Sequence, residues 1–108
     1  MIPKQLRVHA QVLSTLARAK PKVLVKQIKQ LSPDVVRTIK DIAKNYLKGS
    51  IKINKRQIDK LRRHKRSLQE LALRKTSLKR SKKILQKGGF IATLIAPLIS
   101  LFANLLTK

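Results

Sequence analysis

Apolar residues recur at intervals of three and four through the first fifty positions of the chain, which predicts a series of short helices. The first should end before Pro21, because proline removes a backbone donor and restricts the residue ahead of it. A second short helix follows it. The apolar positions that define these two helices are Leu6, Val12, Leu13 and Leu16 in the first, and Leu24, Val25, Ile28 and Leu31 in the second.

The clearest helical pattern begins at Ser32-Pro33-Asp34. This triplet combines a capping hydroxyl, a proline at the first helical position and an acid near the positive helix end. Gly49 supplies a stop signal. The apolar stripe between these signals predicts one long amphipathic helix, and its members are Val35, Val36, Ile39, Ile42, Ala43, Tyr46 and Leu47.

A longer basic helix is expected from Lys55 to Lys75, with Asn54 as its N-cap. Its apolar stripe is narrow and is interrupted at His64 and Lys65, so we expect only one edge to rest on an N-terminal helical bundle. Thr76-Ser77 provides a break and a new cap, and a further basic helix is expected within 78–87. The stripe consists of Ile58, Leu61, Leu68, Leu71 and Ala72.

No charged residue occurs from Gly88 to Thr107. As a helix, the 18 residues of 90–107 would be ~27 Å long, close to the ~30 Å hydrocarbon thickness of a bilayer. A helix that is apolar all round needs to be surrounded, and burial in a membrane or partner is favoured here over burial in the domain's own core. The residues expected to make that contact are Ile91, Leu94, Ile95, Pro97, Leu98, Leu101, Phe102 and Leu105.

The fold class predicted from these patterns is all-α, in three segments. These are a small N-terminal helical bundle (1–50), a basic helical segment (51–87), and a Gly-Gly junction followed by a hydrophobic tail (88–108). The distribution of charge supports this division, because fifteen of the 27 Lys and Arg residues lie in 51–87. The chain has only 4 Asp and Glu, so its formal net charge is +23. So small a domain with such self-repulsion is expected to have a polyanionic partner.

The same composition excludes several classes of site. There is no cysteine, so disulfides, zinc fingers and thiol chemistry are ruled out. With four acids in the chain, a site for a hard cation such as Ca²⁺ is not expected. No nucleophile, base or phosphate loop occurs at motif spacing, so we predict a binding protein without a cofactor rather than an enzyme. The N-terminus also lacks the apolar core of a signal peptide.

Dense runs such as Lys60–Arg66 point in all directions on a helix, which suits an extended polyanion better than one small anion. The predicted partner is nucleic acid, double-stranded DNA above all, bound through phosphates without sequence preference. No aromatic residue lies in the segment to stack on bases. The predicted contacts are Lys55, Arg56, Lys60, Arg62, Arg63, Lys65, Arg66, Arg74, Lys75, Lys79, Arg80, Lys82, Lys83 and Lys87.

Alternatives remain open for the charged runs. They are also compatible with a solvated surface or a nuclear-localisation signal. Three helices in the first fifty residues allow a sequence-specific DNA-binding bundle. A membrane-active protein, with the tail inserted and the basic helices on anionic lipid, is the main alternative function. A ribonucleoprotein component is a further one, which the charge-free tail disfavours.

The order of a basic block at Lys79–Lys83, a Gln86–Phe90 junction and an aliphatic tail around Ile95–Ile99 resembles the adenovirus protein X family, the precursors of core peptide mu. It is similar also to the related proteins of adintoviruses and Polinton/Maverick elements. The close similarity covers about the last thirty residues. The chain departs from the family's cleavage pattern at Gln86, where Met, Ile or Leu is usual.

The resemblance implies a minor virion protein that condenses the genome and resides in the virion and the host nucleus. It further implies that a viral cysteine protease cuts the chain after Gly89, within the junction Gly88, Gly89 and Phe90. The tail is then expected to contact capsid protein or membrane.

Overall fold

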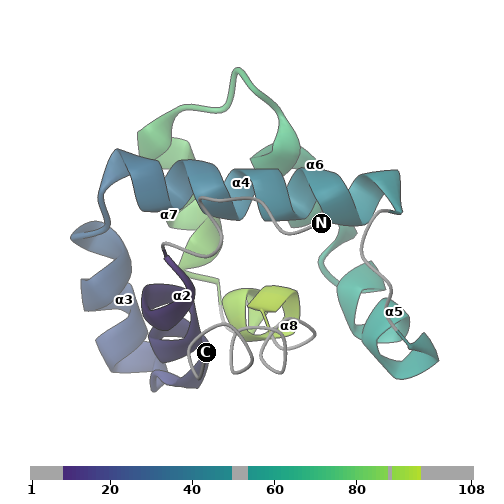
Figure 1. Ribbon diagram of the computed structural model, residues 1–108, viewed down its shortest axis with the longest axis horizontal. Coiled ribbons are helices and arrows are strands. Elements are labelled where there is room, and N and C mark those ends of the chain that lie inside the picture. Colours follow the sequence, from purple (N-terminus) through teal and green to yellow (C-terminus); the bar gives the residue numbers. More distant parts are fainter. Residues whose placement is uncertain (1–8, 50–53, 88, 96–108) are drawn as a thin grey trace.

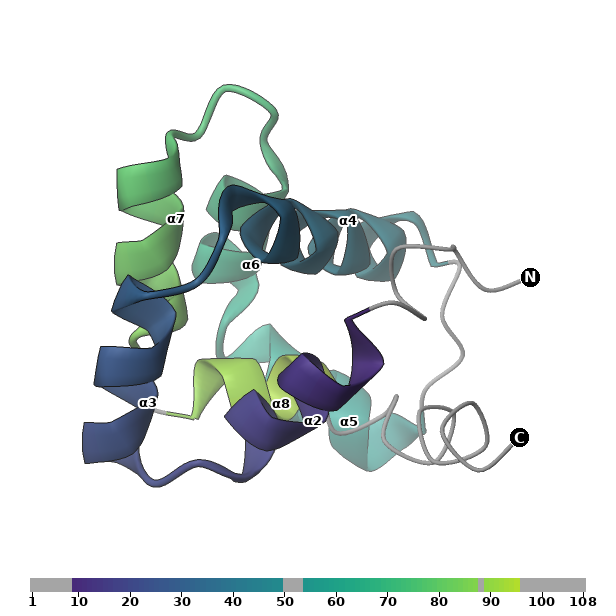
Figure 2. The same ribbon diagram turned by 60° about the vertical axis from the view of Figure 1, so that its left-hand side comes forward.

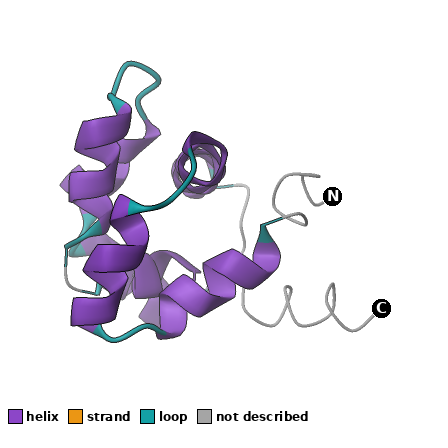
Figure 3. Cartoon of the chain, turned by 90° about the vertical axis from the view of Figure 1, so that its left-hand side faces the viewer, coloured by secondary structure: helices purple, strands orange, loops and turns teal. Residues whose placement is uncertain are grey.

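The computed structural model describes residues 9–49, 54–87 and 89–95, and every regular element within these ranges is an α-helix (Figure 3). The all-α prediction is therefore confirmed for the described chain. In order, the helices are α2 (Ala10–Arg18), α3 (Pro21–Lys29), α4 (Pro33–Lys48), α5 (Lys55–Arg62), α6 (Lys65–Ala72), α7 (Leu78–Leu85) and α8 (Phe90–Ile95).

Local capping signals explain where three of the helices begin. The Ser32 hydroxyl accepts a hydrogen bond from the backbone N–H of Val35 at 3.3 Å, which starts α4. Asn54 and Gln57 form a reciprocal capping box at the start of α5. Ser77 accepts from the N–H of Arg80 at 3.1 Å at the start of α7. Each cap satisfies a helical N–H that has no partner within its own helix.

The helix predicted from Lys55 to Lys75 is wrong as a single element. The chain turns at Arg63 and His64, which separates α5 from α6, and α6 ends at Ala72, where Leu73 takes an extended conformation. The break lies at the gap in the apolar stripe. Because the axis changes there, Leu61 of α5 and Leu71 of α6 can both reach the core (Figure 1).

The three N-terminal helices do not form a bundle of their own. Their main contacts are with later helices: α4 packs mostly against α6, α2 against α8, and α3 against α7. Figure 1 shows α4 lying across α6 and α7, with α2 and α8 beneath it. The prediction of a separate N-terminal bundle is therefore wrong, because each short helix buries its apolar face against the second half of the chain.

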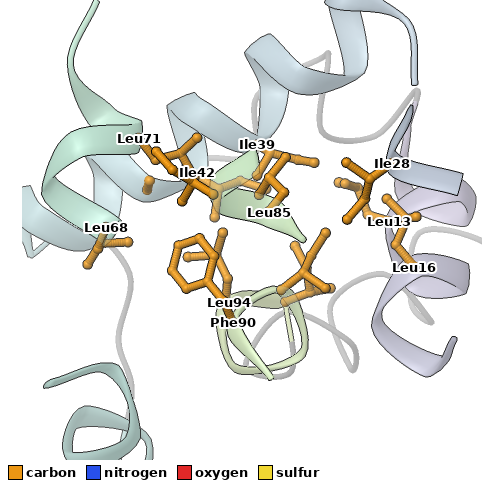
Figure 4. Packing of buried hydrophobic residues seen from close by; sticks show 14 of the residues in the cluster. Leu13, Leu16, Ile28, Ile39, Ile42, Leu68, Leu71, Leu85, Phe90 and Leu94 are labelled. Carbon is orange, nitrogen blue, oxygen red and sulfur yellow. The ribbon is translucent and has the colours of Figure 1, made fainter. Parts of the chain in front are cut away.

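One hydrophobic cluster joins all seven described helices. In Figure 4 the labelled side chains of α4, α6 and α7 lie around Phe90 and Leu94 of α8, and those of α2 and α3 gather to one side of them. Three residues expected on apolar faces remain largely exposed instead: Val12 at 41 %, Leu47 at 46 % and Ile58 at 38 %. Helical spacing places them beside the core face, but they are not among the side chains that the cluster buries within the described residues.

Candidate nucleic-acid interface

The fourteen basic residues predicted to bind nucleic acid lie on α5, α6, α7 and the turns that follow these helices. Thirteen of them are exposed, and Lys82 is half-buried. The charged groups therefore reach solvent, as contact with a large polyanion requires. The sequence pattern alone predicted this, because the narrow apolar stripe leaves most of each helix surface to cations.

Four of the fourteen also have partners within the protein. Arg80 forms a two-pronged ion pair with Glu70, with Nη2 2.9 Å from Oε1. The Lys82 ammonium donates to the carbonyl of Lys29 at 2.9 Å, and that of Lys87 donates to the Ser67 hydroxyl at 3.0 Å. Arg62 lies 3.8 Å from Asp59. Arg80, Lys82 and Lys87 thus join α7 and the turn after it to α6 and α3, a structural role that their charge did not reveal.

The other ten cations make no ion pair or side-chain hydrogen bond within the described part of the chain. Their charges are balanced by no protein group there, so each is available to an external anion. They are Lys55, Arg56, Lys60, Arg63, Lys65, Arg66, Arg74, Lys75, Lys79 and Lys83.

These cations do not share one surface. Figures 1 and 2 place α5 and α7 at opposite ends of α4, with the turn between α6 and α7 projecting beyond it. A continuous basic helix would have presented one rod of charge. The folded chain instead presents positive charge on several sides, which one straight duplex cannot contact all at once.

The sequence-based set of contacts omitted the cations of α4. Arg37, Lys44 and Lys48 are exposed and Lys40 is half-buried. Their spacing of three, four and four residues is itself a helical stripe, so the signal was present in the sequence. The charge density of 51–87 is higher, so the prediction was confined to that segment. The packing of α4 on α6 and α7 brings Arg37, Lys40 and Lys44 beside the turn that carries Arg74.

Packing shifts the proton equilibria of three groups near these cations. Partial burial, with Lys44 adding repulsion, lowers the pKa of the Lys40 ammonium, although Asp41 opposes the change. Burial lowers the pKa of His64 below 6.5, and Lys87 and Arg63 lower it further. The hydrogen bond from Arg80 lowers the pKa of Glu70. All three shifts reduce the number of bound protons: burial is the main cause for Lys40 and His64, and the hydrogen bond from Arg80 is the main cause for Glu70.

The two aromatic residues that the structure describes both pack against the hydrophobic cluster, Phe90 fully buried and Tyr46 partly buried. Phe90 is fully buried, and its ring lies 5.4 Å from that of His64. The Tyr46 hydroxyl donates to the carbonyl of Leu94 at 2.6 Å, and burial raises the pKa of that hydroxyl. Neither ring is presented as a stacking platform for bases.

In its described part the Gly-Gly junction is a turn. The N–H of Phe90 donates to the carbonyl of Lys87 at 3.3 Å, and Gly89 adopts a positive φ of 77° at the start of α8. Gly89 is exposed, whereas Phe90 is buried at 0 %. Gly88 lies outside the described residues.

The apolar tail enters the domain's own core over its first turns. Phe90, Ile91, Leu94 and Ile95 are at most 1 % exposed, so the expectation that the basic domain offers too little surface to bury this helix is wrong for 90–95. The cause is that α2 and α5 flank α8 from both sides. The other predicted tail contacts, Pro97, Leu98, Leu101, Phe102 and Leu105, lie outside the described residues. Among the described helices, none has the length and apolarity to cross a bilayer.

Comparison of the chain with protein-family models, curated proteins and solved structures finds no match.

Proposed function

We propose that this protein binds nucleic acid through its phosphates, without sequence preference, and holds neighbouring duplexes together. The observation that carries the proposal is the placement, on helices at opposite ends of the molecule, of exposed cations that have no partner among the described residues (Figures 1 and 2). One end contacts one duplex and the other end remains free for a second. Neutralising phosphates on both removes the repulsion that keeps duplexes apart.

The lack of sequence preference follows from the kind of contact available. Lysine and arginine side chains on short exposed helices reach phosphates, which carry no sequence information directly. Of the described aromatic rings, Phe90 is buried and Tyr46 is partly buried, and α4 packs mainly on α6 and α7 rather than on a neighbouring helix in a helix-turn-helix pair. Both features support phosphate contacts over reading of bases.

A place in a virion core is the biological setting we propose, and it rests on the resemblance of 79–99 to the protein X family. Cleavage after Gly89 belongs to the same proposal. Because Phe90 is buried, cutting there requires α8 to leave the core first, so cleavage should follow the population of a locally opened state. Release of α8 would remove a large part of the core from the mature basic fragment.

Two unrelated duplexes of equal length test the binding step. The full chain should bind both with equal affinity, and six to ten phosphate contacts should make affinity fall by roughly 10³–10⁵ between 50 and 200 mM salt. A strong preference for one sequence, or affinity that does not change with salt, would overturn the proposal.

The bridging step needs a separate measurement. Donor- and acceptor-labelled duplexes should show energy transfer when the protein is added below saturation. Neutralising one end, with Lys55, Arg56 and Lys60 of α5 changed to Gln, should abolish most transfer while α7 still binds single duplexes. The matched change at the other end is Lys75, Lys79 and Lys83 to Gln. Bridging that survives both triple variants would contradict the role of the two ends.

A further inference from the structure

A cleft between α4, α6 and α7 gathers four cations from parts of the chain far apart in sequence. It has a volume of about 470 Å³, and its walls include Arg37, Lys40 and Lys44 of α4 and Arg74 of the turn after α6. Asp41 is the one acid among its lining residues. The cleft therefore has a net positive lining.

The floor of the cleft holds an independent sign of a missing partner. Ser81 of α7 lines the cleft and is 0 % exposed, and its hydroxyl has no hydrogen-bond partner among the described residues. An unpaired buried hydroxyl is unfavourable, and few occur in folded proteins. A group that accepts a hydrogen bond at this position would satisfy Ser81 and lie among the four cations.

We propose that this cleft binds a phosphate group. A phosphate carries up to two negative charges and offers several acceptor oxygens, which suits two guanidinium groups, two ammonium groups and a hydroxyl. The Lys40 ammonium already donates to the carbonyl of Thr76 at 2.9 Å, which fixes its position at the wall and leaves two N–H donors for a ligand. A carboxylate has one charge and two oxygens, and so matches the lining less well.

The lowered pKa of Lys40 agrees with this arrangement, because its first cause is burial and its second is repulsion from Lys44. A bound phosphate dianion would offset the repulsion between Lys44 and Lys40. This site is distinct from the proposed contacts at the two ends of the molecule, since it holds one phosphate at a fixed place. The phosphate can belong to a nucleic-acid backbone or to a free phosphorylated compound, and the chemistry of the cleft is the same for both.

Titration of the full chain with inorganic phosphate, followed by amide NMR at constant ionic strength, tests the proposal. Saturable shifts are expected at Lys40, Lys44, Arg74 and Ser81, with smaller shifts for acetate. The double variant Lys44→Gln/Arg74→Gln should weaken binding about tenfold to a hundredfold. The matched control Arg56→Gln/Lys60→Gln also removes one arginine and one lysine charge, but from α5, and it should leave the affinity of the cleft for phosphate unchanged.

Ser81→Ala separates a ligand contact from a merely buried hydroxyl. It should raise the Tm of the free protein, because it removes the unpaired group, and weaken phosphate binding by about threefold to tenfold. Unchanged phosphate affinity in Ser81→Ala would overturn the hydroxyl's role. Shifts spread evenly over all basic helices, equal loss in the α5 control, or an equal response to acetate would overturn the site itself.

A short DNA duplex identifies the source of the phosphate. If the cleft takes a backbone phosphate, the cleft variant loses duplex affinity as the α5 variant does; if it takes a free compound, only the α5 variant loses duplex affinity. Failure of every variant and of the unaltered chain to bind DNA would refute the proposed function while leaving the phosphate titration to stand by itself.

Discussion

The adjacent helices α7 and α8 contrast most sharply in the described chain. Both are short, both contribute fully buried residues to the same core, and the Gly89 turn joins them. Helix α7 carries Lys79, Arg80, Lys82 and Lys83 on its outer side, whereas α8 carries no charge. An amphipathic helix belongs at the edge of a domain, and an apolar one must be enclosed.

The contrast teaches that two helices can share one core and differ completely in charge: both supply buried side chains, and only α7 also carries cations. Helix α8 supplies four buried apolar side chains and makes no contribution to the net charge. Helix α7 supplies cations whose mutual repulsion opposes compactness. Substitutions of the buried residues of α8 should therefore change folding, and substitutions of the exposed cations of α7 should change binding.

The largest expected effect is loss of folding when Phe90 is truncated. Phe90→Ala should lower the free energy of unfolding by about 3–5 kcal/mol, because the ring is fully buried at the centre of the cluster. That is a large part of the ~5–15 kcal/mol typical of a domain. Urea denaturation measures it, with Phe90→Leu as a milder control. An unchanged midpoint would show that α8 is not part of the core.

Neutralising the outer side of α7 should act on binding alone. Lys79→Gln/Lys83→Gln removes two cations that have no partner among the described residues, and should reduce DNA affinity about tenfold to a hundredfold near 0.1 M salt. Its Tm should stay equal or rise slightly. Fluorescence anisotropy measures the DNA affinity and thermal unfolding measures the Tm, with Thr93→Ala in α8 as the uncharged control. An equal loss of DNA affinity in Thr93→Ala would contradict a binding role specific to the α7 cations.

The turn between the two helices should be sensitive to backbone strain rather than to crowding. Gly89 has a φ of 77°, and a Cβ added there would meet no atom within 4 Å. Gly89→Ala should therefore cost about 1–2 kcal/mol through the left-handed conformation alone. Gly49→Ala, at a φ of 75° after α4, is a matched comparison. A more stable Gly89→Ala variant in chemical denaturation would contradict this geometry.

The smallest effect expected is a pH dependence of stability that arises from His64, which lies against Phe90 of α8. Burial lowers the pKa of His64, which lies against Phe90, so between that pKa and 6.5 the unfolded chain binds more protons than the folded one. Stability should fall as pH decreases through 6.5. Thermal unfolding from pH 7.5 to 5.5 measures the slope, and His64→Phe should flatten it. Equal slopes in both proteins would assign the effect elsewhere.

Much of the local structure was predictable because its causes are local. The caps at Ser32, Asn54 and Ser77 act within three residues, so their positions predicted the starts of α4, α5 and α7. The break at His64 was visible only as a gap in the apolar stripe. The cations of α4 were spaced as a stripe but were overlooked, since their significance depends on what lies beside them.

The sequence by itself determined that the described chain is helical, where α4, α5 and α7 begin, and that cations outnumber acids by far. Only the tertiary structure decided that α8 is enclosed, that α5 and α7 lie at opposite ends, and that Arg74, the α4 cations and Ser81 line one cleft. Helix formation depends on neighbours within one turn. The burial of α8 and the approach of cations from separate helices depend on which apolar faces pack together. That packing is determined by all the apolar faces of the chain at once.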